Sequence, residues 1–201
     1  MAPLDLRIET AFAELPLPGE AESGDLCLVK RVGKATLLAV VDGLGHGQGA
    51  ASAAHAAIGA IDRYSREPLP ELVKRCHDAL VGLRGVVLGL ALLDPGSAAM
   101  TWLGVGNIGG MLLRPDGKSK LSRVSLVPIA GFIGAEPLHA TARAVALTAR
   151  DTIVLYSDGV KDGFAESLVL ANSPQQIADS IIARHIKGND DALALVARYG
   201  A

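Results

Sequence analysis

The chain has 201 residues, of which 50% are hydrophobic, 20% charged and only 3% aromatic, and its formal net charge at pH 7 is -2. This length predicts a single domain over residues 1–201, and the hydrophobic content excludes a largely disordered chain. The near-neutral charge gives no basic surface for nucleic acid, so we expect no nucleic-acid partner.

The sequence also carries signals about its compartment. Acidic residues stand near the N-terminus, where a secretory signal would have a positive region followed by an apolar run. Cys27 and Cys76 lie far apart and lack the spacing of a disulfide framework or a zinc site. The uncharged stretches 43–61 and 95–113 are interrupted by glycine and polar residues, which favours buried core over membrane spans. We therefore expect a cytoplasmic protein with no membrane partner.

Aliphatic segments and helical periodicities divide the chain into elements. In chain order they predict strands at 26–32 and 36–41, helices at 49–64 and 69–83, strands at 86–93, 100–105, 110–113, 142–147 and 152–156, a helix at 174–186 and a strand at 192–197. The last helix has Ser173 as a candidate N-cap and Pro174 in its first turn.

The order of these elements indicates a fold class. The middle of the chain, from residue 86 to about residue 156, is typical of a meander of antiparallel strands. Helices flank this region instead of alternating with single strands, as they would in a parallel sheet. We therefore predict an α+β fold in which two mostly antiparallel sheets pack together with helices outside.

Acidic residues recur where the predicted strands begin or end. Asp25 opens the strand LCLVKRV, Asp42 ends TLLAVV, Asp158 follows TIVLY, and Asp190 and Asp191 open ALALVA. A carboxylate at the tip of an apolar strand is costly unless it is solvated, paired or bound to a cation. One such residue is an ordinary turn residue, but here four strand ends share the feature, each beside a glycine or asparagine that permits a tight turn.

Convergence of these strand ends would create a cluster of oxygen ligands. Such a cluster suits magnesium or manganese rather than zinc. Gly43 would let a backbone carbonyl approach an ion, because glycine has no Cβ to block it. Two ions that share a carboxylate can activate water for attack on phosphorus. Neither cysteine begins a C-x5-R phosphate loop and the chain has no GxSxG segment, so no protein nucleophile is predicted.

The acidic turns also carry a family resemblance. Ser23-Gly24-Asp25, the run Val41 to Gly47, Ser157 to Val160 and Asp190-Asp191 resemble, in order, the motifs of the metal-dependent PPM serine/threonine phosphatases in their SpoIIE-like branch. The resemblance implies a four-layer αββα sandwich with two manganese or magnesium ions at one edge. It also implies hydrolysis of phosphoserine and phosphothreonine by metal-activated hydroxide. The short chain and its Gly104 to Asn107 segment resemble single-domain members that act on phosphorylated stressosome proteins, which implies substrates in stress signalling.

Carried over residue by residue, the resemblance implies a ligand set. Asp42 would bridge both ions, Gly43 would offer its carbonyl to the first, and Asp158 and Asp190 would hold the second. Asp25 would lie close by, as a ligand or as an acceptor for metal-bound water.

The resemblance leaves several assignments open. Asp190 is preferred to Asp191 because the first acid of this pair is the ligand in the family. His46 is a candidate general acid or an exposed turn residue, Gly47 begins a helix whose N–H groups could face a phosphate, and Asn107 is a further candidate substrate contact.

Two departures from the family pattern affect the region around the metals. Leu193 stands where the family often has threonine, and Glu20 and Glu22 crowd a region where some members place a phosphate-binding arginine.

Two other functions compete with phosphatase activity. Residues 45–50 match the dinucleotide fingerprint G-x-G-x-x-G/A, but no strand with an acidic residue follows about twenty residues later, and residues 104–109 match the same pattern without a following helix. The second alternative is a catalytically weak phosphatase-like module that binds a partner without turning it over.

Overall fold

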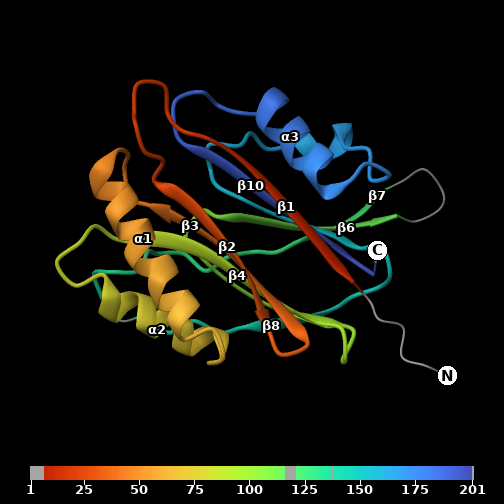
Figure 1. Cartoon of the computed structure of the whole chain (residues 1–201), viewed down its shortest axis with the longest axis horizontal. Coiled ribbons are helices and arrows are strands. Elements are labelled where there is room, and N and C mark those ends of the chain that lie inside the picture. The colour runs from red at the N-terminus through yellow and green to blue at the C-terminus, as the bar shows by residue number, and fades with distance from the viewer. Residues whose placement is uncertain (1–6, 116–120, 137, 201) are drawn as a thin grey trace.

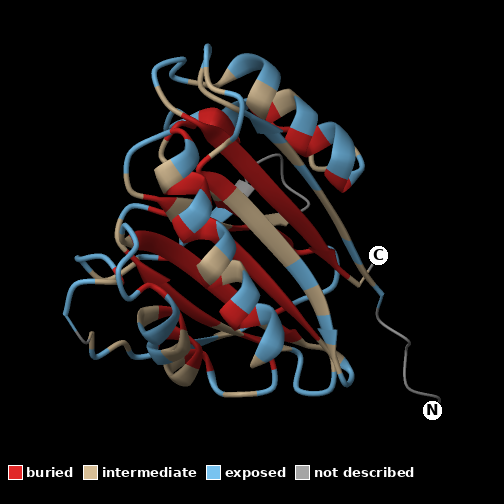
Figure 2. Cartoon of the chain, turned by 60° about the vertical axis from the view of Figure 1, so that its left-hand side comes forward, coloured by how far each residue is buried: buried red, intermediate tan, exposed pale blue. Residues whose placement is uncertain are grey.

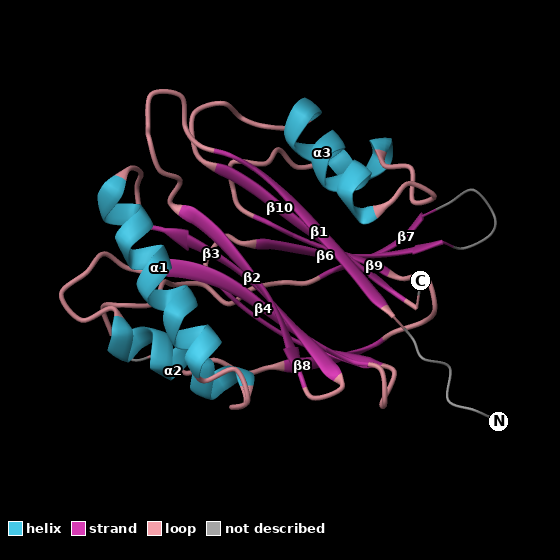
Figure 3. Ribbon diagram, viewed as in Figure 1, coloured by secondary structure: helices cyan, strands magenta, loops and turns pink. Residues whose placement is uncertain are grey.

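The computed structural model describes residues 7–115, 121–136 and 138–200. Within these residues, two five-stranded sheets lie face to face and helices cover their outer surfaces (Figures 1 and 3). The first sheet has the order β1 (Ile8–Leu15), β10 (Ala192–Tyr199), β9 (Thr152–Tyr156), β6 (Gly109–Pro115), β7 (Leu121–Ser125). The second has the order β2 (Asp25–Val32), β3 (Ala35–Gly43), β4 (Val86–Asp94), β5 (Ala99–Val105), β8 (Arg143–Ala146).

Three helices and one short 3-10 turn complete the described part of the fold. They are α1 (Gln48–Arg63), α2 (Leu69–Ala79), the turn η1 (Phe164–Ser167) and α3 (Pro174–Arg184). Helices α1 and α2 lie over the second sheet, and α3 lies over the first sheet (Figure 1). The predicted αββα sandwich of two antiparallel sheets is therefore confirmed.

Strands at the centre of each sheet are buried on both faces (Figure 2). In β3, Leu38 and Val40 pack between the sheets, whereas Leu37, Ala39 and Val41 pack against the helices. Side chains alternate between the faces of a strand, so a strand covered on both sides needs apolar residues at every position. This explains the continuous aliphatic runs in the sequence.

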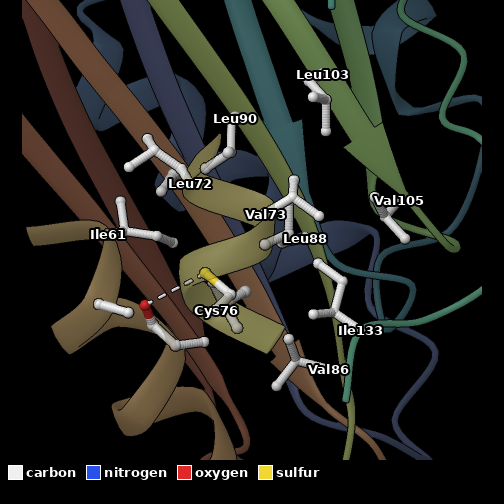
Figure 4. Close-up of a cluster of buried hydrophobic side chains, with 14 of the residues drawn as sticks. Ile61, Leu72, Val73, Cys76, Val86, Leu88, Leu90, Leu103, Val105 and Ile133 are labelled. Atoms are coloured by element: carbon white, nitrogen blue, oxygen red, sulfur yellow. Dashed lines mark hydrogen bonds between the residues drawn. The ribbon is translucent and has the colours of Figure 1, made fainter. Parts of the chain in front are cut away.

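The helices pack closely because their buried faces are small or aliphatic. Alanines line the buried side of α1, and Cys76 of α2 lies near it with its Sγ 3.7 Å from the Ala57 carbonyl oxygen (Figure 4). Burial raises the pKa of the Cys76 thiol to about 12, so this thiol is a packing residue and not a reactive one. Helix α3 begins with the predicted cap, since Ser173 and Gln176 form a reciprocal capping box.

Three predictions about the elements were wrong. Residues 86–156 do not form one meander, because the chain crosses between the sheets after β5, β7 and β8. The predictions omitted β1 and β7, and α2 ends at Ala79 instead of residue 83. Beyond α2 the backbone turns through Gly82, whose φ of 79° lies in the left-handed region that glycine favours.

No helix in the described ranges is long and apolar enough to cross a membrane.

Candidate metal centre

The register of the strands brings the acidic turns to one end of the sandwich. Asp25, at the start of β2, pairs directly with Asp42, near the end of β3. On the other sheet, Asp158 follows β9, and Asp190 and Asp191 precede its antiparallel neighbour β10, so these residues also share one end. All five carboxylates are close enough to influence one another electrostatically. The convergence predicted from the sequence is present.

Asp191 connects the two sheets at this end through hydrogen bonds of its side chain. Its side chain is only 3% exposed and accepts hydrogen bonds from the backbone N–H of Leu17 at 2.7 Å and of Gly24 at 2.8 Å. Gly159 lets the opposite loop approach, since a Cβ there would lie 1.9 Å from the Asp191 carbonyl oxygen. The Asp191 carboxylate is thus occupied by protein donors, whereas the neighbouring Asp190 is more exposed.

Asp25 and Asp42 lie in a much less favourable environment for charge. Asp25 is 1% exposed, and its Oδ2 has no hydrogen-bond partner. Burial, followed by repulsion from neighbouring carboxylates, raises the pKa of Asp42 to about 9. Burial also raises the pKa of Asp25 to about 7, although a hydrogen bond from Ser157 opposes the shift. The protein supplies little positive charge or hydrogen bonding to this half of the site, so ionisation of these two carboxyl groups is unfavourable without a cation.

Gly43 allows the end of β3 to abut the first turn of α1. Its N–H donates to the Gly24 carbonyl at 3.0 Å, and a Cβ on Gly43 would lie 2.1 Å from the Ala50 carbonyl oxygen. No other residue fits this space without moving the helix. The close approach accounts for glycine here, and its role as a backbone ligand stays a prediction.

The candidate substrate residues are placed beside carboxylates. The amide Nδ2 of Asn107 donates to Oδ2 of Asp158 at 2.6 Å, so Asn107 holds one of the predicted ligands. His46 is exposed, and its Nδ1 lies 2.7 Å from Oε1 of Glu20. The Glu20 carboxylate also flanks Gly47, the N-cap of α1, where a Cβ would lie 2.8 Å from Glu20 Oε2.

Sequence reasoning missed the role of Ser157, which lies within the third acidic motif. This buried side chain forms a hydrogen bond with Asp25 and accepts one at 2.9 Å from the backbone N–H of Leu193. A buried serine one residue before a predicted ligand was the signal that could have revealed this contact.

A comparison with models of known protein families shows which family the chain belongs to. The model of the family described as Stage II sporulation protein E (SpoIIE) matches residues 33–200. The chain belongs to the SpoIIE family. Phosphoserine phosphatase RsbX of Bacillus subtilis (strain 168) is 24% identical over 175 residues, which cover 87% of this chain and 86% of the relative.

Solved structures show the same SpoIIE-type fold. A chain from a structure of the bacterial stressosome, described as a modular system adapted to control secondary messenger signalling, has a TM-score of 0.85 and 28% identity, covering 96% of this chain and 100% of that chain. RsbX in complex with magnesium has a TM-score of 0.85 and 22% identity, covering 96% of this chain and 95% of that chain.

The residues at this end of the SpoIIE fold suit a hard divalent cation. In the described part of the chain, no three His, Cys, Asp or Glu side chains form a closed metal-binding group. Magnesium, however, usually retains several waters and takes only one or two carboxylates, so an open cluster fits it. The unpartnered Oδ2 of Asp25 and the raised pKa of Asp42 both indicate missing positive charge.

The same geometry rejects the dinucleotide alternative. That fingerprint needs a parallel βαβ unit. In this SpoIIE-family chain, α1 leads into α2 rather than into a strand, and the pairings between the described strands are antiparallel. The glycines of residues 45–50 therefore need another explanation.

Proposed function

We propose that this protein is a serine/threonine phosphatase that hydrolyses phosphoserine and phosphothreonine with two manganese or magnesium ions at the acidic end of the sandwich. The observation that carries the proposal is the uncompensated pair Asp25 and Asp42 facing three further carboxylates. Membership of the SpoIIE family supports the same activity. When bound, such ions activate water and neutralise charge on phosphoryl oxygens.

The roles proposed for the residues follow their environments. Asp42 would bridge both ions, with the Gly43 carbonyl on the first and with Asp158 and Asp190 on the second. Asp25 would accept a proton or a hydrogen bond beside them, because its Oδ2 has no protein donor. Asp191 is left to its two backbone N–H donors.

The proposed substrates are phosphorylated proteins of a stressosome or a related stress-signalling system. Support comes from the similarity to phosphoserine phosphatase RsbX and to a chain from a stressosome structure. We further propose that residues 1–201 act as a single catalytic domain in the cytoplasm, where free thiols such as Cys27 and Cys76 stay reduced.

A phosphatase assay tests the proposal. The purified protein is incubated with a phosphoserine peptide and with an aryl phosphate, in the presence of manganese, magnesium or excess chelator. Release of phosphate that needs metal and disappears with chelator supports the proposal. Turnover that is equal with and without metal contradicts it.

The same purified protein can be used to distinguish a phosphatase from the catalytically weak module and from a dinucleotide-binding protein. Binding of metal and phosphopeptide without phosphate release would indicate the catalytically weak module instead of a phosphatase. Replacement of Asp158 by Asn should abolish turnover without unfolding the protein, as judged by circular dichroism. Titration with NAD checks the dinucleotide alternative, for which we expect no binding.

A further inference from the structure

The loop after Asp42, defined here as the metal loop (residues 42–47), is held from outside by the dipeptide Arg84-Gly85. This dipeptide ends the connection between α2 and β4. The Gly85 carbonyl accepts a hydrogen bond from Leu44 N–H at 2.9 Å. The Arg84 Nη1 donates to the His46 carbonyl at 3.2 Å and lies 3.4 Å from the Leu44 carbonyl oxygen. The contacts therefore fix backbone groups on both sides of Gly45.

Gly45 of the metal loop and Gly49 in the first turn of α1 make room for the Arg84 side chain. A Cβ on Gly49 would lie 2.8 Å from Arg84 Cζ and Nε, and a Cβ on Gly45 would lie 3.0 Å from Arg84 Nη1. Gly45 also has a φ of 88°, which favours glycine by itself. Gly45 is also the first glycine of the dinucleotide fingerprint, so the guanidinium supplies a packing reason for that position of the pattern.

Ordinary surface electrostatics does not explain the position of Arg84. The ion pairs of the described residues do not include this arginine. Its guanidinium lies over the first turn of α1, where a cation opposes the helix dipole. Its hydrogen bonds go instead to metal-loop carbonyls.

We propose that Arg84 is a positioning residue that fixes the metal loop and so sets the affinity of the site for divalent cations. The inference rests on the proposed function, because it assigns the loop's purpose to metal binding. Asp42 and Gly43 are also the last two residues of β3, and Leu44 follows Gly43 directly, so movement of Leu44 would act on the Gly43 carbonyl. Groups that orient metal ligands contribute about 10–100-fold to metal affinity in other proteins.

Metal titration of the protein without substrate tests the role of Arg84. Manganese affinity is measured by calorimetry, with free ion followed independently by electron paramagnetic resonance. Arg84→Met keeps the apolar part of the side chain but removes its donors, and we expect its Kd for manganese to rise about tenfold or more. Arg84→Lys keeps a charge and some donors without the planar fork, so we expect a smaller rise.

A second variant perturbs the contact without changing Arg84. Gly49→Ala should push the guanidinium away from the loop and raise the Kd in the same direction. If both changes act through one contact, the double variant Gly49→Ala with Arg84→Met should bind manganese no more weakly than Arg84→Met alone. At saturating manganese, turnover of Arg84→Met should approach that of the parent protein, since the ligands themselves are intact.

Arg66 provides the matched control. It is an exposed arginine beyond the other end of α1 and has no hydrogen bond within the described ranges. Arg66→Met should leave the Kd unchanged. Unchanged Kd values for both Arg84→Met and Gly49→Ala would overturn the inference, as would an equal weakening by Arg66→Met. Failure of the parent protein to bind manganese would instead overturn the proposed function, and this inference with it.

Discussion

The two sheets contribute differently built halves to the acidic site. On the second sheet, Asp25 and Asp42 are desolvated and have raised pKa values. On the first sheet, Asp191 accepts two backbone N–H groups, and Asp158 accepts the amide of Asn107. The first sheet therefore satisfies Asp158 and Asp191 with protein donors, although burial raises the pKa of Asp190, while the second sheet leaves Asp25 and Asp42 largely without donors.

The contrast between Asp191 and Asp42 separates a structural role from a functional one within one cluster of like residues. A carboxylate held by protein donors contributes to the fold, because removal of its charge leaves those donors unpaired. A carboxylate in an uncompensated environment costs stability until a cation binds. Substitution of the two kinds should therefore move stability and activity in different directions.

The largest effect is expected from Asp42→Asn. The isosteric amide removes the proposed bridging ligand, so phosphatase activity should fall by about a thousandfold or more, as expected when the metal centre is lost. The melting temperature of the metal-free protein at pH 7 should rise, because a group with a folded pKa of about 9 no longer has to be buried against other acids. Asp62→Asn is the control, since Asp62 pairs with Lys30 on the surface. Full activity of Asp42→Asn would show that the site is misplaced.

Asp191→Asn should have the opposite effect on stability. Its amide can replace only one of the two acceptor oxygens, so either Leu17 N–H or Gly24 N–H loses its partner. We expect the free energy of unfolding in urea to fall by about 1–3 kcal/mol. Activity should fall less than in Asp42→Asn. A metal-free protein stabilised by this substitution would remove the distinction between the two halves.

These long-range contacts mark the limit of what the sequence could predict. The buried strands and the acidic turns could be found because continuous aliphatic runs and strand-end acids are local patterns. The hydrogen bond between Asp191 and Leu17 joins residues 174 positions apart, and the hydrogen bond between Arg84 and His46 joins residues 38 positions apart. No local pattern encodes either pairing, since both depend on how the sheets and loops pack.

Strand β1 was missed for a related reason. Among the described strands it pairs only with β10, at the edge of its sheet, and its eight residues include the polar Glu9, Thr10 and Glu14 without a regular alternation. A half-exposed edge strand needs fewer apolar residues than β3, so its signal is weaker. The assignment of strands to two sheets instead of one meander also depends on packing of their faces, which periodicity alone does not record.

Asn107→Ala tests the donor on the first sheet with a smaller expected effect. Loss of the 2.6 Å hydrogen bond to Asp158 should let this carboxylate rotate, and the Kd for manganese should rise about tenfold. Asn107→Asp would change the charge next to Asp158 as well as the hydrogen bond, so Asn107→Ala is the cleaner variant. A control is Asn172→Ala, in the loop before α3. Equal manganese affinity for Asn107→Ala and the parent protein would contradict a role of Asn107 in orienting Asp158.

The last prediction concerns the pH dependence of the metal-free protein. In the folded state the pKa of Asp25 is about 7 and that of Asp42 about 9, whereas an unfolded aspartate has a pKa of about 3.9. Between these values the folded protein holds protons that the unfolded chain has released, so stability present at low pH is lost as pH rises through the folded pKa values. The urea midpoint without metal should therefore fall from pH 6 to pH 9.

Two comparisons test whether the fall in the urea midpoint arises from Asp25 and Asp42 on the second sheet. Asp42→Asn should flatten the upper part of the curve, because it removes the group with the highest folded pKa, and saturating manganese should oppose the fall by favouring the ionised carboxylates. Asp191→Asn should lower the whole curve and change its slope less than Asp42→Asn does, because Asp191 is only one of several carboxylates that raise the pKa values of Asp25 and Asp42. A metal-free midpoint that rises from pH 6 to pH 9 would contradict the view that Asp25 and Asp42 are uncompensated.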